Sequence, residues 1–187
     1  MRKAEDKNTG GEVRISGGVF RGQKIKTPGS GTHPMGERER IALFNMISGH
    51  LNGSSVIDLY CGGGTLGIEA LSRGAAFVLF VDNNARAIKT TNENLQKLGI
   101  DGSRSRATVS DAMSLASATT DRYDLVIADP PYDKYDAKML ANLPKLLLGS
   151  GILVLSHPGE APAIDGLVLQ KTHSYARANI SIYFVAS

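Results

Sequence analysis

The sequence predicts an α/β fold with a doubly wound, mostly parallel sheet of seven strands. From residue 55 onward, short apolar runs rich in β-branched residues alternate with segments of helical periodicity. Strands that alternate with helices at this pace form a mostly parallel sheet that helices cover on both faces. In addition, four successive runs end at or near an aspartate, as expected for a ligand site along one edge of such a sheet.

A short extension precedes this region. Residues 1–12 are polar and charged, and we expect them to be disordered. Residues 13–36 are expected to form a small β-hairpin, with two short strands around glycine-rich turns, followed by a loop. Residues 37–187 then form the main domain, and a chain of 187 residues is long enough for one sizeable core.

The main domain is expected to begin with a helix over 37–51. Glu37 and Glu39 fall in its first turn, where the helix dipole favours negative charge. Apolar residues at helical spacing predict its buried face: Leu43, Phe44, Ile47 and Leu51.

Seven strands and four further helices are expected after this helix. The strands are predicted at 56–60, 77–81, 107–110, 125–128, 152–155, 167–171 and 180–185. The helices are predicted at 65–73, at 84–98, from 112, and at 137–148. Pro144 is expected to bend or interrupt the last of these helices.

Composition excludes several classes of protein. Cys61 is the only cysteine, so the chain can form neither an internal disulfide nor a cysteine metal cluster, and the four histidines show no ligand spacing, so we expect no metal. No apolar run approaches the roughly 20 residues of a membrane span. We expect a cytoplasmic monomer.

The positive charge lies at the N-terminal end of the chain. Residues 1–40 hold nine Lys or Arg and five Asp or Glu, a balance of +4, whereas residues 41–187 hold twelve and thirteen, a balance of −1. This excess favours a polyanionic partner such as nucleic acid, although a merely soluble basic end explains it equally well.

A glycine-rich loop follows the strand at 56–60. Gly62, Gly64 and Gly67 satisfy the G-x-G-x-x-G pattern of nucleotide cofactor sites, and Asp82 lies 20 residues after the first glycine. A nicotinamide-dependent oxidoreductase is therefore one interpretation. Asp58, just before the glycines, opposes it, because a carboxylate there would repel a pyrophosphate.

An acidic edge suits the cationic cofactor S-adenosylmethionine better. Asp58 could serve its amino-acid end, Asp82 its ribose hydroxyls, and Asp111 its adenine amine. For Asp82 and Asp111, capping of a helix N-terminus is the alternative explanation.

The stretch Asp129-Pro130-Pro131-Tyr132 ends the strand at 125–128 and is suited to binding a planar amine. Two prolines cannot continue a central strand, because neither has the N–H that a ladder needs. Asp129 and the Pro130 carbonyl could accept both protons of an amino group, while Tyr132 stacks on the attached ring. An ordinary proline turn remains the alternative.

These motifs together resemble the RsmD-type small-subunit rRNA guanine-N2 methyltransferases. The resemblance rests on RISGGVFRGQKIKTP, RERIALFNMI, DLYCGGGTLGIEALSRGA, FVD, SDA and ADPPY, and it covers roughly residues 14–184. It implies a Rossmann-like class I methyltransferase fold, S-adenosylmethionine as cofactor, and ribosomal RNA or the assembling small subunit as partner. The chain departs from the family's usual sequence at His33-Pro34-Met35, Ser156 and Tyr175-Ala176.

The resemblance and the motifs together assign candidate site residues. Catalysis is assigned to Asp129, Pro130, Pro131 and Tyr132. Cofactor binding is assigned to Asp58, Tyr60, Gly62, Gly64, Asp82, Asn83, Asp111, Ala112 and Asp129. RNA binding is assigned to Arg14, Arg21, Lys24, Lys26 and Arg38.

The predicted reaction is methyl transfer to the exocyclic N2 amine of a guanine in small-subunit rRNA. Three alternatives stay open on the residues alone. A DNA amino-methyltransferase would share the pocket, a nicotinamide oxidoreductase would fit the glycines, and a non-catalytic RNA-binding module would fit the basic hairpin.

Overall fold

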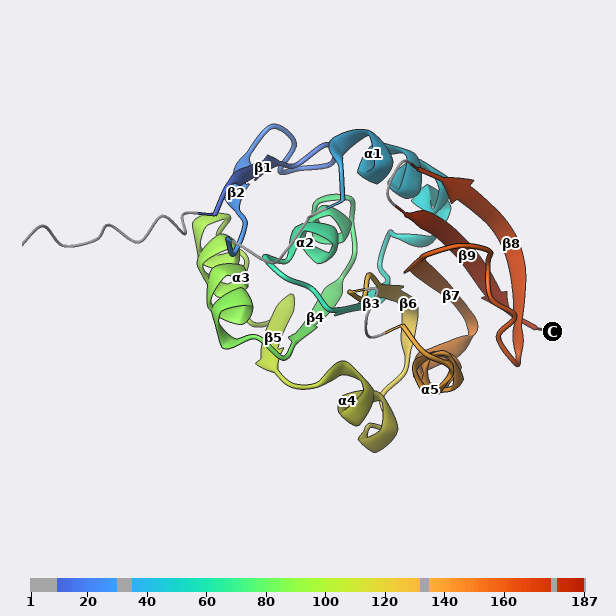
Figure 1. Ribbon diagram of the computed structural model, residues 1–187. Helices are drawn as coiled ribbons and strands as arrows, with labels where there is room; N and C mark the ends of the chain where they lie inside the picture. The colour runs from blue at the N-terminus through green and yellow to red at the C-terminus, as the bar shows by residue number, and fades with distance from the viewer. Residues whose placement is uncertain (1–9, 30–34, 132–134, 176–177, 187) are drawn as a thin grey trace, which may run out of the picture.

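The computed structural model describes residues 10–29, 35–131, 135–175 and 178–186, and their course is shown in Figure 1. The strands are β1 (Glu12–Arg14), β2 (Lys24–Lys26), β3 (Ser55–Leu59), β4 (Phe77–Asp82), β5 (Ser105–Val109), β6 (Tyr123–Ala128), β7 (Leu147–His157), β8 (Leu167–Ser174) and β9 (Asn179–Val185). The helices are α1 (Glu37–Met46), α2 (Thr65–Ser72), α3 (Ala85–Lys97), α4 (Ala112–Ala118) and α5 (Ala137–Asn142), with short 3-10 turns at Ser48–His50 and Leu143–Leu146.

The seven-stranded sheet confirms the predicted fold class. Its strand order is β5-β4-β3-β6-β7-β9-β8; neighbours from β5 to β7 run parallel, whereas β9 is antiparallel to both β7 and β8. The chain leaves β3 towards β4 and β5, and then returns to the other side of β3 with β6. This reversal makes the carboxyl ends of β3 and β6 the expected ligand site.

Helices cover both faces of this sheet (Figure 1). Alternate residues of β3 point to opposite faces: Val56 packs in a core with α1, α2 and α3, whereas Ile57 and Leu59 pack in a second core with α4 and α5. A strand buried on both faces must be apolar throughout, which explains the continuous apolar runs in the sequence.

The predicted helix over 137–148 is wrong at its C-terminal end. Helix α5 ends at Asn142, a 3-10 turn with Pro144 near its start follows, and Leu147 already begins β7. Pro144 lacks the N–H that a longer α-helix would need, so the change of structure falls around it. The predicted helix over 37–51 likewise ends early, at Met46, before a 3-10 turn.

The hairpin of β1 and β2 packs against the main domain. Ile15 and Ile25 are fully buried in the core that contains α1, α2 and α3. Glu12 begins β1, although the predicted tail included it, and residues 1–9 lie outside the described residues. The division into a hairpin unit and a catalytic domain stays a prediction.

Buried polar contacts also connect the hairpin to the helices. Glu69 of α2 accepts hydrogen bonds from the Ser16 backbone N–H (3.0 Å) and hydroxyl (2.7 Å), and from Arg73 Nε (2.9 Å). Arg40 of α1, only 2% exposed, donates to the Arg14 carbonyl (2.8 Å). The position of the hairpin is therefore fixed by side chains more than 25 residues away in the sequence.

Candidate active site

Four aspartates lie at the carboxyl ends of four neighbouring strands, as the sequence predicted. Asp58 is in β3 and Asp82 ends β4, while Asp111 and Asp129 follow β5 and β6. Because β5, β4, β3 and β6 are consecutive parallel strands, these carboxylates share one edge of the sheet. The site is consequently acidic at the point where strand order reverses.

Asp58 is the most buried of the four, with 1% of its surface exposed. Its Oδ2 accepts a hydrogen bond from the Gly67 N–H at 2.8 Å, which holds the first turn of α2 against β3. Burial raises the pKa of Asp58 to about 8, and the negative charges of Asp129 and Asp82 act in the same direction. A cation bound at this edge would favour its ionised form.

The loop between β3 and α2 has an unusual backbone conformation. Tyr60 has φ 61°, in the left-handed region that non-glycine residues rarely adopt, and Gly62 and Gly64 have φ of 55° and 79°. Such strain at a non-glycine residue costs about 1–3 kcal/mol and is found mostly at functional sites. A Cβ at Gly63 would lie only 2.8 Å from the Lys26 carbonyl oxygen, so close packing with the hairpin requires this glycine.

Two side chains of α3 hold this loop, and periodicity alone did not single them out for this role. Thr91 donates its hydroxyl to the Gly62 carbonyl at 2.9 Å, and Asn94 donates to the Gly63 carbonyl at 2.8 Å. Asn94 also exchanges hydrogen bonds with the backbone of Lys26. The sequence did offer one signal for this role: Thr91 and Asn94 are polar residues on the otherwise apolar face of an amphipathic helix, where a buried polar side chain needs a hydrogen-bond partner.

The structure shows which of Asp82 and Asp111 caps a helix. Asp82 accepts from the Gly62 N–H at 2.9 Å and from the Asn84 N–H at 2.8 Å, whereas Asn84 itself caps α3. Asp111 does cap a helix, because it is the N-cap of α4 and accepts from the Ser114 N–H at 2.8 Å. Asn83 is exposed and Ala112 is buried in the first turn of α4. The assignment of Asp82, Asn83, Asp111 and Ala112 to the cofactor site stays a prediction.

Asp129 is partly buried where β6 ends. Burial and the negative charge of Glu39 raise its pKa, while a hydrogen bond from the Ser156 hydroxyl opposes this shift. Pro130 is buried and Pro131 is exposed; Tyr132 lies outside the described residues, so its stacking role stays a prediction.

The departures from the family sequence have unequal structural consequences. Ser156, near the end of β7, lies beside Asp129, because Ala128 of β6 pairs with Leu155 of β7. Met35 packs against the core, and its carbonyl accepts a hydrogen bond from Arg40 Nη1 at 2.8 Å. His33, Pro34 and Ala176 lie outside the described residues.

The five candidate RNA-binding cations are exposed, and several already have partners within the protein. Lys24 pairs with Glu12 at 3.1 Å and Lys26 with Glu93 at 3.0 Å, while Arg14 donates to the Gly22 carbonyl.

A groove of about 420 Å³ lies between the hairpin and the start of α1. Its lining includes Glu12, Arg14, Lys24, Met35, Gly36 and Arg40.

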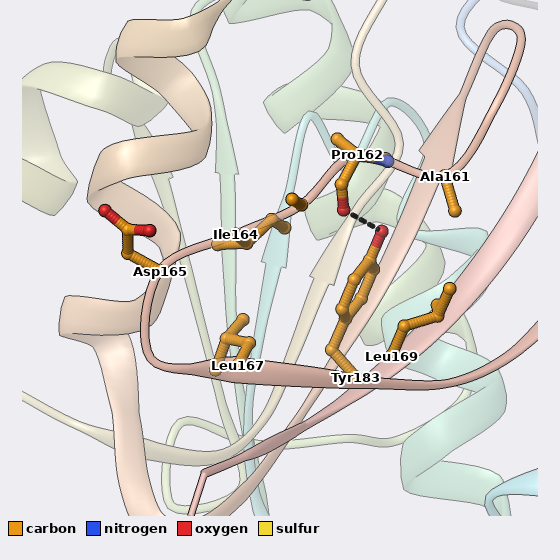
Figure 2. Close-up of a pocket in the computed structure, with 8 residues that line it drawn as sticks. Ala161, Pro162, Ile164, Asp165, Leu167, Leu169 and Tyr183 are labelled. Carbon is orange, nitrogen blue, oxygen red and sulfur yellow. Dashed lines mark hydrogen bonds between the residues drawn. The ribbon is translucent and has the colours of Figure 1, made fainter.

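A second cavity, of about 320 Å³, lies away from the acidic edge. Figure 2 shows it between the segment after β7 and strands β8 and β9, where the Tyr183 hydroxyl donates to the Pro162 carbonyl at 2.8 Å. Its lining includes Ile164, Leu167 and Leu169, and contains none of the four edge aspartates. The cavity is therefore separate from the candidate active site.

Metal and membrane sites are not found in the part of the chain that the structure describes. It contains no group of three or more His, Cys, Asp or Glu side chains placed to hold a metal ion. Every helix in it is too short or too polar to cross a membrane. Cys61 is buried beside the glycine loop, and burial raises the pKa of its thiol.

Comparison with known proteins identifies the family. Residues 13–184 match a family described as conserved hypothetical protein 95. The chain belongs to this family. It is 30% identical over 180 residues to "Putative rRNA methyltransferase YlbH" of Bacillus subtilis, which covers 91% of this chain and 98% of that protein.

Other relatives in the comparison carry related names. The chain is 32% identical over 135 residues to "Ribosomal RNA small subunit methyltransferase D" of Haemophilus influenzae, covering 71% of this chain and 70% of that protein. Among solved structures, "Putative methyltransferase yhhF from Escherichia coli" has a TM-score of 0.85 and 26% identity, covering 94% of this chain and 98% of that one. These names confirm the resemblance to the RsmD-type family that the sequence motifs indicated.

Proposed function

We propose that this protein is a methyltransferase that uses S-adenosylmethionine to methylate the exocyclic N2 amine of a guanine in small-subunit ribosomal RNA. The observation that carries the proposal is the juxtaposition of Asp129-Pro130 with the glycine loop at the point where strand order reverses. Family relatives named as rRNA methyltransferases support the coarser part of this proposal, methyl transfer to ribosomal RNA.

The chemistry of the acidic edge fits a cationic cofactor. Asp58 is buried beside Asp82 and Asp129, and its raised pKa reflects both the burial and those charges. A positive ligand relieves this repulsion, whereas the pyrophosphate of a nicotinamide dinucleotide would add to it. The Gly67 N–H, which a phosphate could use at the start of α2, is already bonded to Asp58.

In the proposed reaction, the chain positions two bound reactants. S-adenosylmethionine supplies an electrophilic methyl group on a sulfonium sulfur. Asp129 and the Pro130 carbonyl accept hydrogen bonds from the two N–H groups of the guanine amine, which favours a pyramidal nitrogen with a directed lone pair. As the nitrogen–methyl bond forms, the sulfur–methyl bond breaks to leave a thioether, and the surplus amine proton is released to solvent. Holding reactants in near-attack geometry can contribute about 7–11 kcal/mol to catalysis. Asp58, Asp82 and the glycine loop hold the cofactor, and Tyr132 stacks on the base.

A transfer assay tests this proposal. Purified protein is mixed with methyl-labelled S-adenosylmethionine and with either naked small-subunit RNA or assembled small subunits, and the labelled nucleotide is identified by mass spectrometry. We expect label in N2-methylguanosine. Label in DNA alone would favour a DNA amino-methyltransferase, and RNA binding without transfer would favour a non-catalytic module.

Cofactor binding is expected to depend on Asp82. Asp82→Ala should weaken S-adenosylmethionine binding by about 1–3 kcal/mol in calorimetry, because it removes hydrogen bonds to a charged group. Asp121→Ala is the matched control, since Asp121 is exposed before β6 at the opposite edge of the sheet. Unchanged affinity in Asp82→Ala, or tight dinucleotide binding by the unmodified protein, would contradict the assignment.

RNA binding is expected to depend on the hairpin cations. Changing Arg21, Lys24 and Lys26 together to Ala should weaken RNA binding and flatten its salt dependence, by about one unit of slope for each phosphate that the hairpin no longer neutralises. Because Lys24 and Lys26 pair with Glu12 and Glu93, part of their charge is already offset, and the slope is expected to fall by less than the full value for three phosphates.

A charge-matched variant controls for this removal of three cations. Lys138, Lys145 and Lys171 are exposed on α5, the following 3-10 turn and β8, and their replacement by Ala removes the same charge elsewhere. Equal effects of the two triple variants on RNA binding would show that net charge, and not the hairpin, determines it. Cofactor affinity should be unchanged in both.

A further inference from the structure

We propose that Ser156 is a positioning residue, whose hydroxyl orients the Asp129 carboxylate towards the substrate amine. This inference rests on the proposed methyl transfer and concerns a residue that the sequence motifs assigned no role. It follows from the sheet register, from the burial of Ser156 beside Asp129, and from the two prolines that follow Asp129.

The register of the sheet brings the two residues together. Ala128 of β6 pairs with Leu155 of β7, so the next residues, Asp129 and Ser156, lie side by side at the carboxyl ends of these strands. Ser156 is 3% exposed, and it is also paired with Ile180 in the ladder between β7 and β9. Its backbone is therefore held by the sheet on the side away from Asp129.

The Ser156 hydroxyl takes the place of the backbone N–H groups that donate hydrogen bonds to Asp82 and Asp111. Asp82 and Asp111 accept hydrogen bonds from N–H groups two and three residues further on, at Asn84 and Ser114. Asp129 is followed by Pro130 and Pro131, and neither proline has an N–H. The nearest following backbone cannot orient this carboxylate, and a hydroxyl from the next strand does so.

The surroundings of Asp129 disfavour its charged form. Burial raises its pKa, and the negative charge of Glu39 of α1 acts in the same direction. The neighbouring Ser156 hydroxyl acts in the opposite direction and lowers the pKa of Asp129, so it favours the ionised carboxylate. An ionised carboxylate with one oxygen engaged by Ser156 can present the other to an amine proton.

The test compares Ser156→Ala, Ser156→Thr and Ser54→Ala with the unmodified protein. Ser54 is a matched control, because it is also a buried serine and its hydroxyl donates to the Leu51 carbonyl at 2.8 Å. It lies just before β3, at the amino-terminal ends of the parallel strands and away from the candidate site. Ser156→Ala should lower kcat roughly 10- to 100-fold, the range for one hydrogen bond to a charged group, with the KM for S-adenosylmethionine unchanged. Ser156→Thr retains the hydroxyl and should restore most of the rate, and Ser54→Ala should behave as the unmodified protein.

The pH profile separates positioning from a structural role. The Ser156 hydrogen bond favours the ionised form, so its loss should raise the pKa of Asp129 and move the acidic limb of kcat to higher pH. Carbon-13 NMR of labelled aspartate carboxyls measures that pKa without turnover, with Asp129→Asn identifying the signal. We expect a higher Asp129 pKa in Ser156→Ala and an unchanged one in Ser54→Ala.

The outcomes distinguish this inference from the proposed function. An active unmodified protein whose kcat, acidic limb and Asp129 pKa are unaffected by Ser156→Ala would overturn the positioning role alone. An unmodified protein that transfers no methyl group to any RNA would overturn the proposed function and this inference with it. A loss in Ser156→Ala that Ser156→Thr does not restore would also count against the hydroxyl.

Discussion

Replacing Asp129 with alanine is expected to lower kcat at least about 100-fold, the lower range for removing one preorganised electrostatic partner. Its hydrogen bond strengthens as the attacking nitrogen becomes positive, so it stabilises the transition state more than the bound substrate. Affinity for RNA should therefore change little. Single-turnover kinetics with saturating substrates measures this loss directly.

Asp129→Asn is the sharper variant. The amide oxygen can still accept a hydrogen bond from the amine, so part of the activity should survive if Asp129 acts as a hydrogen-bond acceptor. If Asp129 were instead an obligatory proton-abstracting base, Asp129→Asn should lose as much activity as Asp129→Ala. Equal and complete loss in both variants, with folding and cofactor binding preserved, would refute the acceptor mechanism. Nearly normal turnover in Asp129→Ala would indicate that Asp129 is only a turn residue without a catalytic role.

Replacing Glu69 with alanine is expected to lower the free energy of unfolding by about 3–5 kcal/mol, as found when one member of a buried ion pair is removed. Glu69 is fully buried and pairs with Arg73 at 2.9 Å, while Arg40 Nε lies 3.9 Å away. The variant removes the carboxylate that pairs with Arg40, also buried, and both hydrogen bonds to Ser16. Urea denaturation followed by circular dichroism measures the change.

An exposed ion pair provides the control for this result. Glu93 pairs with Lys26 at 3.0 Å, and both side chains are well exposed to solvent. Glu93→Ala should change the free energy of unfolding by less than about 1 kcal/mol, because water and salt screen such a pair. Glu69→Gln retains the shape and one acceptor, so its loss should be intermediate. Similar small losses in Glu69→Ala and Glu93→Ala would show that the buried network is not needed for stability.

The sequence alone determined the fold class and the position of the candidate site. The runs at 56–60 and 125–128 and the glycines between Cys61 and Thr65 are local signals, because strand burial and turn conformation depend on neighbouring residues. Once the parallel sheet is predicted, Asp58, Asp82 and Asp129 must share its carboxyl edge. The prediction of a helix over 137–148 was partly wrong, because Leu147 and Leu148 fit both the helical and the strand periodicity. The pairing of β7 with β6 places Leu147 in a strand.

Only the tertiary structure decided how the site is supported. The register of β6 and β7 places Ser156 beside Asp129, and Asn94 donates hydrogen bonds to the Gly63 and Lys26 carbonyls. The Ser16 N–H donates to Glu69. Each of these contacts joins residues far apart in the sequence. No periodic pattern encodes such contacts, because they depend on strand order and on which helix face meets the loop. A buried carboxylate or amide must find its partner wherever packing brings one within reach, and that partner is set by the fold as a whole.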